Sequence, residues 1–319
     1  MSALYLQLLY EIERFNPELE SIESIFIGGG TPSTISPHLY RDIFKRLRPY
    51  LKRDAEITIE ANPNSATERW LEGIKELGVN RISFGVQSFN EKKLKALNRS
   101  HSPRDAEEAI INADRLGFQH ISLDLIYNYQ GDSEELLKSD IDRAFQLPIE
   151  HISAYELTIE PKTKFFKTPE VKQESDNLAI FVSDEIKKRG FKQYEISNFG
   201  RYQSSHNQGY WRLKDYMGIG AGAVGFLKDR RFYPQTDIDR YIQNPLDIRE
   251  EILSEEEILT ERIFLGFRSD IGVDRDILTK EMQSRADFLV KEDKLEFKNS
   301  RYTNPNLLLA DEVALFLIS

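Results

Sequence analysis

Apolar residues recur along this chain in two spacings that alternate with each other. Leu4, Leu8 and Ile12 recur at helical spacing, so we expect the chain to open on an amphipathic helix. Short apolar runs of strand length follow, and a helical pattern comes after each of them. The predicted strands cover residues 24–27, 57–59, 81–86, 120–126 and 151–159, and the predicted helices cover 37–51, 67–77, 103–116, 133–145 and 175–189. Repeated units of this length predict a parallel sheet, either open and doubly wound or closed into a (β/α) barrel.

The alternation ends after Glu195, where an irregular stretch rich in Gly and aromatic residues runs to about Pro245. From Ser254 the pattern predicts helices over 255–267, 274–282 and 285–290, a short hairpin over 295–302, and a last helix over 305–317. This order is typical of a small winged-helix-like unit, which can bind DNA or serve only in packing. We therefore expect a βα barrel domain (1–200), an irregular connecting region (201–250) and a winged-helix-like C-terminal domain (251–319).

Composition narrows the classes of function. The 319 residues carry 43 Lys and Arg against 53 Asp and Glu, and this net charge of −10 argues against a nucleic-acid binder, because neutralising phosphates needs a basic surface. It also favours packing over DNA binding for the C-terminal unit. No apolar run is long enough for a transmembrane segment and the start lacks a signal peptide, so we expect a cytoplasmic protein. The chain contains no cysteine, which excludes disulfides, thiolate zinc sites and cysteine-ligated iron–sulfur clusters within these residues.

Small or polar residues stand where the predicted strands end. Three glycines at 28–30 follow the first strand, and Glu60, Gln87, Asp124 and Tyr155 lie at the ends of the next four. In a parallel βα barrel the carboxyl ends of the strands meet at one rim, where ligands bind, so these ends point to one site. Glycines let a backbone approach a ligand closely, although a tight turn uses the same residues.

Each polar candidate has a structural alternative. Glu60 could be an ordinary exposed carboxylate, but its place before Asn-Pro favours the rim, where it can accept hydrogen bonds from a ribose diol. Gln87 can both donate and accept hydrogen bonds. Asp124 lies between apolar neighbours and needs a partner, which a ligand or a structural Lys or Arg would supply. Arg99 can hold a ligand carboxylate in a bidentate way, or is an exposed arginine after a helix.

The segment 206–211, His-Asn-Gln-Gly-Tyr-Trp, is a second cluster. An imidazole followed by Tyr and Trp in a loop can ligate haem iron or another metal while the aromatic rings cover the macrocycle; otherwise such a histidine is a hydrogen-bonded core residue. The segment 220–225 fits the dinucleotide fingerprint by its letters, but no strand precedes it and it opens no helix, so we discount it. The five histidines do not form a metal-ligand spacing.

Several motifs occur together and in order. They are Ile-Phe-Ile-Gly-Gly-Gly-Thr-Pro (25–32), Ile-Glu-Ala-Asn-Pro (59–63), Arg-Ile-Ser-Phe-Gly-Val-Gln-Ser-Phe (81–89) and Asp-Leu-Ile-Tyr (124–127). As a set they resemble the radical S-adenosylmethionine (SAM) proteins related to oxygen-independent coproporphyrinogen III oxidase. With His-Asn-x-x-Tyr-Trp at 206–211 the chain is similar to the HemW-type haem chaperones of that group, where this motif is associated with haem binding. The resemblance covers essentially the whole chain.

The resemblance implies an α/β fold, namely a partial (β/α)6 radical SAM barrel that lacks its first strand here, with a winged-helix-like domain at the C-terminus. It implies a SAM pocket at the strand ends, in which the SAM-binding residues are Gly29, Gly30, Thr31, Glu60, Gln87, Arg99 and Asp124. It also implies haem binding, with His206 near the iron, by His206, Asn207, Tyr210 and Trp211.

The departures from the family are equally informative. The first strand and the CxxxCxxC loop that hold a [4Fe-4S] cluster in the family have no counterpart here. Without three thiolates no cluster can be ligated and SAM cannot be cleaved to a radical by this polypeptide as written, so we expect a truncated or misassigned start rather than natural loss. Val224 stands where the family commonly has His, and 130–133 also differs from the usual wording.

Three functions follow as hypotheses. The first is a haem-binding chaperone that delivers haem to respiratory haem proteins, without a nucleic-acid partner and with transient membrane association left open. The second is a coproporphyrinogen III oxidase-like radical SAM enzyme of porphyrin biosynthesis, so enzymatic activity stays open; the motif at 206–211 favours the chaperone. The third is a cluster-free pseudoenzyme that keeps only SAM or haem binding.

Overall fold

The computed structural model describes residues 1–160 and 164–319, which form two compact units. Residues 24–39 and 55–203 make up one, called here the sheet unit. Residues 1–23, 40–54 and 204–319 make up the other, called the terminal unit because it holds both chain ends. The expected division of the chain near residues 200 and 250 stays a prediction.

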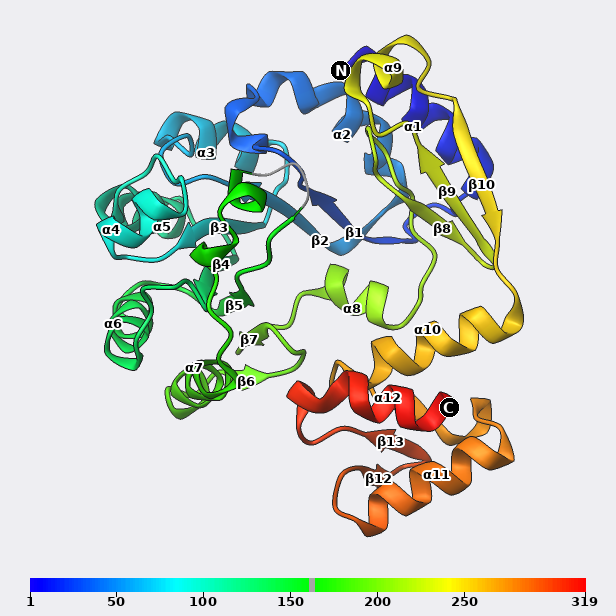
Figure 1. The fold of residues 1–319 in the computed structure, drawn as a ribbon. Helices are drawn as coiled ribbons and strands as arrows, with labels where there is room; N and C mark the ends of the chain where they lie inside the picture. The colour runs from blue at the N-terminus through cyan, green and yellow to red at the C-terminus, as the bar shows by residue number, and fades with distance from the viewer. Residues whose placement is uncertain (161–163) are drawn as a thin grey trace. The chain divides into compact units, whose positions relative to one another are not determined.

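A sheet of seven strands dominates the sheet unit in the described part of the chain, in the order β1-β2-β3-β4-β5-β7-β6 (Figure 1). The neighbours β2, β3, β4 and β5 are parallel, as the repeated strand–helix pattern predicts, whereas β7 pairs antiparallel with both β5 and β6. The strands are β1 (Ile22–Ile27), β2 (Leu51–Ala61), β3 (Arg81–Gln87), β4 (His120–Tyr127), β5 (His151–Glu156), β6 (Lys192–Gln193) and β7 (Asn198–Gly200).

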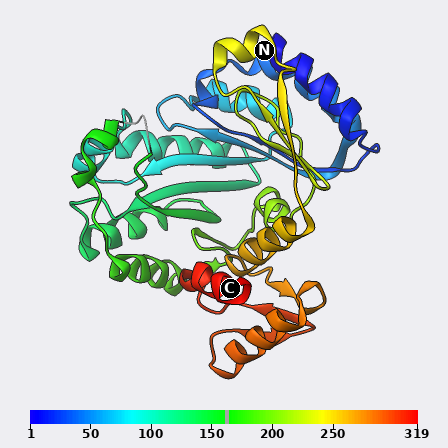
Figure 2. The same cartoon turned by 45° about the vertical axis from the view of Figure 1, so that its right-hand side comes forward.

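The helices of the sheet unit lie along one face of this sheet (Figure 2). Polar side chains cap their N-termini: Ser102 and Asp105, for example, form a reciprocal capping box at the start of α5. Glycines with positive φ follow several helices, as expected from Gly78, Gly117 and Gly190. The helices are α3 (Glu68–Glu76), α4 (Glu91–Ala96), α5 (Pro103–Arg115), α6 (Glu134–Ala144) and α7 (Asp176–Lys188).

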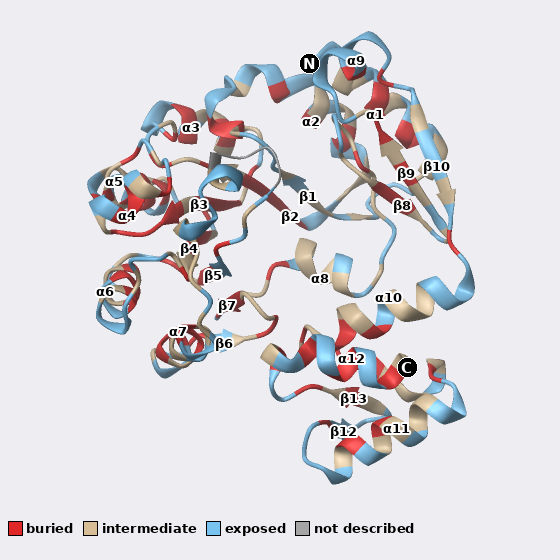
Figure 3. Cartoon of the chain, viewed as in Figure 1, coloured by how far each residue is buried: buried red, intermediate tan, exposed pale blue. Residues whose placement is uncertain are grey.

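Alternation along the strands makes the two faces of the sheet chemically different. The register aligns Phe84, Leu123 and Ile152 across β3, β4 and β5, and this apolar layer is buried. On the opposite face the register aligns Ser83, Ser122 and His151, which are also buried. Figure 3 shows buried residues along the central strands, whereas the helices are buried on one side and exposed on the other. The site therefore lies on a sheet with one apolar and one polar face.

Several predicted boundaries are wrong, and the strand predicted over 151–159 ends at Glu156 as β5. Residues 37–51 do not form one helix: two 3-10 turns, η2 (Pro37–Tyr40) and η3 (Arg48–Tyr50), flank α2 (Arg41–Leu47). Proline stands in the first turn of η3, and since it has no amide hydrogen to donate to the carbonyl four residues earlier, the regular α-helical hydrogen bonding ends there. The strand β2 then begins at Leu51, earlier than the predicted 57.

The terminal unit holds the predicted opening helix, α1 (Ser2–Phe15), which contacts α2 and α9 (Ile238–Gln243). The prediction of an irregular stretch after residue 200 is wrong. This stretch forms α8 (Ser205–Trp211) and an antiparallel sheet of β8 (Gly225–Leu227), β9 (Arg230–Pro234) and β10 (Ile248–Ile252), in the order β10-β9-β8. The pattern there is obscured because its strands are short and its turns are rich in glycine.

The last part of the chain has its own core, built around Ile263, Phe267, Leu289 and Tyr302. Helix α10 (Glu255–Phe267) and the hairpin of β12 (Glu296–Lys298) and β13 (Arg301–Thr303) agree with prediction. Separate helices over 274–282 and 285–290 do not: β11 (Val273–Asp274) and a 3-10 turn, η6 (Arg275–Ile277), precede one helix, α11 (Lys280–Lys291). The last helix, predicted over 305–317, begins later: a 3-10 turn, η7 (Leu307–Leu309), precedes α12 (Ala310–Ile318).

Candidate functional site

The three glycines after β1 form a turn in which the backbone of Gly29 and Gly30 faces open space. Gly29 and Gly30 have φ angles of +78° and +62°, in the left-handed region that favours glycine. No atom lies within 4 Å of the position that a Cβ would take at either residue. Thr31 follows, and its carbonyl accepts hydrogen bonds from both the amide and the hydroxyl of Thr34. The turn is held in place while its glycine backbone stays accessible.

Glu60 lies one residue before the end of β2, beside this turn. The Gly29 amide donates a hydrogen bond to Glu60 Oε2 over 3.3 Å. A Cβ on Gly28 would lie 3.0 Å from the same oxygen, so the carboxylate packs closely against the turn. Desolvation by burial raises the pKa of the Glu60 carboxyl, and the Gly29 amide partly offsets this rise. Glu60 is thus a half-buried carboxylate at the rim, as its place before Asn-Pro predicts.

Gln87 ends β3 in a strained conformation. Its φ is +68°, which is uncommon for a residue with a side chain, and the pairing of β3 with β4 shifts register between Phe84 and Gln87. The side chain is buried, and a Cβ on Gly85 would lie 3.0 Å from its Nε2. Strain of this kind persists only where the surroundings over-determine it, and it is concentrated at functional sites.

Asp124, in β4, is half-buried between hydroxyl groups of both neighbouring strands. Ser83 Oγ donates to Asp124 Oδ1 over 3.3 Å, and Ser153 donates to the same carboxylate. Burial and then the charge of Glu60 raise the pKa of the Asp124 carboxyl to about 7, although the two serines and Arg81 oppose the rise. The strand ends therefore bring together two carboxyl groups that are both difficult to ionise.

Arg99 lies in the loop between α4 and α5, where the charge of Asp124 favours the protonated guanidinium. Burial lowers the pKa of the guanidinium, and the nearby Asp124 carboxylate opposes this. His101 supports the loop, because its Nε2 lies 2.9 Å from the carbonyl oxygen of Val86 at the end of β3. The structure thus places the predicted Arg99, Asp124 and Glu60 in one electrostatic group.

Tyr155, which is expected at a strand end, also lies at this group, whereas Ser83 and Arg81 are absent from the predicted set. Tyr155 ends β5, and desolvation with the charges of Asp124, Glu195 and Glu60 raises the pKa of its hydroxyl. Ser83 and Arg81 lie on the same face of β3, and Arg81 is buried with an unpaired Nε. Counting alternate positions back from the strand ends would identify these residues, because such positions share a face.

A chain of hydrogen bonds continues from Asp124 into the polar face of the sheet. Ser83 Oγ and Ser122 Oγ are 3.0 Å apart, Ser122 Oγ lies 3.0 Å from His151 Nδ1, and His151 Nε2 lies 2.6 Å from Tyr194 Oη. His151 and Tyr194 are both buried. Burial, aided by the charge of Arg81, holds the pKa of the His151 imidazole well below its usual range. The imidazole is therefore neutral at physiological pH.

The second predicted cluster lies in the terminal unit, on a helix rather than in the expected loop. The positions 206, 207, 210 and 211 of α8 fall within one side of the helix, since residues four apart are neighbours. None of the side chains of α8 is buried. The His206 and Tyr210 rings meet edge to face with centroids 4.8 Å apart, and the Asn207 amide donates to Ser204 Oγ, the N-cap. The helix thus presents an imidazole beside aromatic rings.

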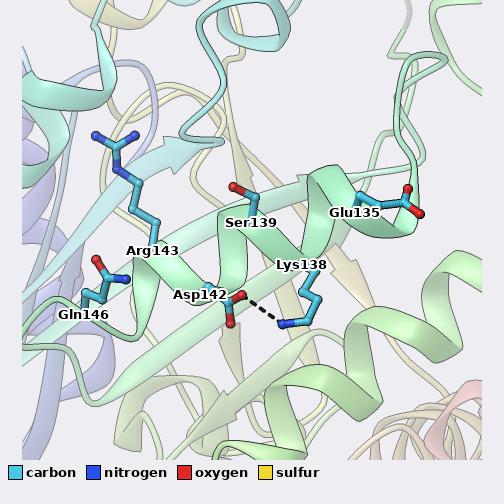
Figure 4. A pocket seen from close by; sticks show the side chains of 6 residues that line it. All are labelled: Glu135, Lys138, Ser139, Asp142, Arg143 and Gln146. Atoms are coloured by element: carbon cyan, nitrogen blue, oxygen red, sulfur yellow. Dashed lines mark hydrogen bonds and ion pairs between the residues drawn. The ribbon is translucent and has the colours of Figure 1, made fainter.

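Other candidate sites contribute little. A depression of about 380 Å³ over α6 includes no predicted site residue, and its wall holds an exposed ion pair of Lys138 and Asp142 (Figure 4).

Within the described residues, His, Asp and Glu nowhere gather in a group of three or more suited to a metal ion. No helix in the described ranges combines the length and apolar character needed to span a bilayer. The 319 residues also offer no cysteine thiolate for a cluster.

Comparisons with known proteins agree with the motifs. The sequence model of the Radical SAM superfamily matches residues 5–144. "Heme chaperone HemW" of Lactococcus lactis is 34% identical over 281 residues, covering 83% of this chain and 73% of the relative. "Heme chaperone HemW" of Bacillus subtilis is 35% identical over 273 residues, covering 80% of this chain and 72% of the relative.

The fold is similar to that of a solved structure. Coproporphyrinogen III oxidase (HemN) from Escherichia coli, a radical SAM enzyme, matches with a TM-score of 0.80. The match covers 99% of this chain and 82% of that one, at 18% sequence identity. The predicted α/β radical SAM fold is therefore confirmed. Given the fold and the identity shared with both haem chaperones, the chain belongs to the HemW haem chaperone family within the radical SAM superfamily.

Proposed function

We propose that this protein binds haem as a carrier, in which His206 would ligate the iron and Asn207, Tyr210 and Trp211 would lie beside the porphyrin. The observation that carries the proposal is the arrangement of α8, which presents these four positions on one side, with the His206 and Tyr210 rings in edge-to-face contact. A neutral imidazole ligates haem iron, and aromatic rings pack well against the macrocycle. Family membership is consistent with this cargo.

We propose that SAM binds at the strand ends of the sheet unit. The open backbone of Gly29 and Gly30 suits its amino-acid part, because a ligand can approach where no atom lies within 4 Å of the Cβ positions, and Thr31 follows directly. Arg99 suits its carboxylate and Glu60 its ribose hydroxyls. Gln87 and Asp124 complete the pocket. When bound, SAM supplies a cationic sulfonium centre, which suits a pocket where carboxyl groups gather.

The residues of this chain do not suit the [4Fe-4S] cluster that radical SAM proteins carry. A [4Fe-4S] cluster needs thiolate ligands, and the 319 residues contain no cysteine. We derive no radical step and no porphyrin-decarboxylating activity for them.

We propose a cytoplasmic protein that passes haem to respiratory haem proteins. The order α10, β11, α11, β12, β13, with β13 central in the small sheet, supports a winged-helix-like unit that serves in packing. Its core of Ile263, Phe267 and Tyr302 is independent of any ligand.

Titration with hemin tests the haem proposal. We expect the purified protein to shift and sharpen the Soret band of hemin, and His206→Ala to abolish the shift. His38→Ala is the matched control, because His38 is an exposed histidine of the sheet unit and its loss should leave the spectrum unchanged. An unchanged hemin spectrum with the wild-type protein, or equal binding by His206→Ala, would contradict the proposal.

A further inference from the structure

A ladder of aromatic rings runs from α8 to β8 within the terminal unit. The His206 and Tyr210 rings are 4.8 Å apart and nearly perpendicular, at 88°. The Tyr210 and Tyr216 rings are 4.5 Å apart at 78°, again edge to face. Tyr216 then lies 6.0 Å from the ring of Phe226, which is buried. Each ring therefore limits the orientation of the next one.

The Tyr216 end of this ladder is firmly held. Its amide donates to the carbonyl of Phe226 and its carbonyl accepts from the amide of Phe226, both over 2.8 Å. Asp215 accepts a hydrogen bond from the amide of Lys228, and Lys214 pairs with Glu23. The segment after α8 is thus joined by backbone and side-chain bonds to β8 and to the start of β1.

The His206 end of the ladder lies on a short helix. Helix α8 has seven residues and buries none of its side chains. A helix this short is marginal without tertiary contacts, so its orientation depends on its neighbours. The Tyr210–Tyr216 contact is one such neighbour contact, and it acts on the residue that packs directly against the imidazole.

We propose that Tyr216 is a positioning residue that orients the His206 imidazole for iron ligation through Tyr210. Tyr216 lies outside the His-Asn-x-x-Tyr-Trp motif, five residues after its end. The inference rests on the proposed haem binding by His206. The ring of Tyr216 performs the task by edge-to-face packing, and its hydroxyl is not required.

Three variants test the proposal: Tyr216→Phe keeps the ring, Tyr216→Leu keeps apolar volume without a ring, and Phe288→Ala is the control. Phe288 is also a half-exposed aromatic residue of the terminal unit in a ring pair, with Phe316, remote in sequence from α8. Circular dichroism and thermal unfolding establish that each variant folds. Hemin affinity and the electron paramagnetic resonance spectrum of the ferric complex are then measured.

We expect Tyr216→Leu to weaken hemin binding about two- to tenfold and to broaden the ferric signals, because the imidazole then takes several orientations. Tyr216→Phe and Phe288→Ala should match the wild type in both measurements. Identical spectra and affinities for Tyr216→Leu and Tyr216→Phe would overturn the inference. Loss of ligation in Tyr216→Phe would overturn the role assigned to the ring. Equal hemin binding by His206→Ala and the wild type would instead contradict the proposed haem binding by His206. The two failures are therefore distinguishable.

Discussion

Ser83 on β3 donates a hydrogen bond to Asp124 on β4, between Oγ and Oδ1, over 3.3 Å. Asp124 also lies directly opposite Ser153 on β5, which bonds the same carboxylate from the other side. The two serines and the charge of Arg81 do not offset the desolvation of the carboxylate and the negative charge of Glu60. The pKa of Asp124 consequently rises to about 7, and the charge at the strand ends changes near neutral pH.

This pKa determines how Asp124 affects stability. An acid whose pKa is higher in the folded than in the unfolded protein contributes stability that is fully present below about pH 4 and is lost as the pH rises through 7. Asp124→Asn, which cannot ionise, should therefore have a free energy of unfolding about 2–4 kcal/mol higher than that of the wild type at pH 8. It should accordingly unfold at a higher urea concentration. The difference should vanish toward pH 4. Urea midpoints across this range measure it.

Asp142→Asn is the opposite control. Hydrogen bonds from Lys138 and Arg189 lower the pKa of Asp142, so its charge stabilises the fold above pH 4 and its removal should lower stability at pH 8. Equal urea midpoints for Asp124→Asn and the wild type at every pH would show that ionisation of Asp124 does not lower the stability of the fold.

Gly30→Ala tests the glycine turn. Alanine at a φ of +62° costs about 1 kcal/mol of strain, and its methyl group enters the open space where we place the amino-acid part of SAM. We expect the variant to fold with slightly lower stability and to lose SAM binding measured by calorimetry. Gly190→Ala is matched, because Gly190 also has positive φ and open surroundings but ends α7. If the two variants bind SAM equally well, the turn is not part of the pocket.

Lys93→Met tests a buried ion pair. Lys93 Nζ lies 2.7 Å from Asp132 Oδ1, and neither side chain has exposed surface. Removing the cation leaves a buried carboxylate without its partner, so we expect chemical denaturation to show a loss of about 3–5 kcal/mol. Adding Asp132→Asn should restore part of the loss. Lys138→Met, in an exposed pair with Asp142, should change stability little. If Lys93→Met with Asp132→Asn is no more stable than Lys93→Met alone, the two side chains are not energetically coupled.

His151→Gln tests the hydrogen-bonded chain in the polar face. Because the pKa of His151 is depressed in the folded protein, its contribution to stability is present above about pH 6.5 and is lost as the pH falls. The variant should lose about 1–3 kcal/mol at pH 7.5 through its weaker bonds to Ser122 and Tyr194. This deficit should shrink toward pH 5. His38→Gln, at an exposed position, is the control and should leave the stability close to that of the wild type. A constant deficit for His151→Gln would exclude the titration.

Much of the fold follows from local pattern. The helices α1 and α10 and the parallel strands β3 to β5 lie where spacing predicts them, because apolar periodicity and capping act over a few residues. The turn at 28–30 and the rim position of Glu60 follow from residue type, since only glycine adopts such φ values readily and Asn-Pro halts a strand.

Other features require the folded chain. Helix α8 is too short to be stable alone, so contacts with residues such as Tyr216 decide its conformation, and the sequence pattern there reads as irregular. The raised pKa of Asp124 depends on desolvation by burial and on the charge of Glu60, which lies far from it along the chain and reaches it only through the pairing of β2, β3 and β4. Residue order therefore specifies which groups line the strand ends, whereas their charges and orientations depend on desolvation and contacts that exist only after the strands and helices pack.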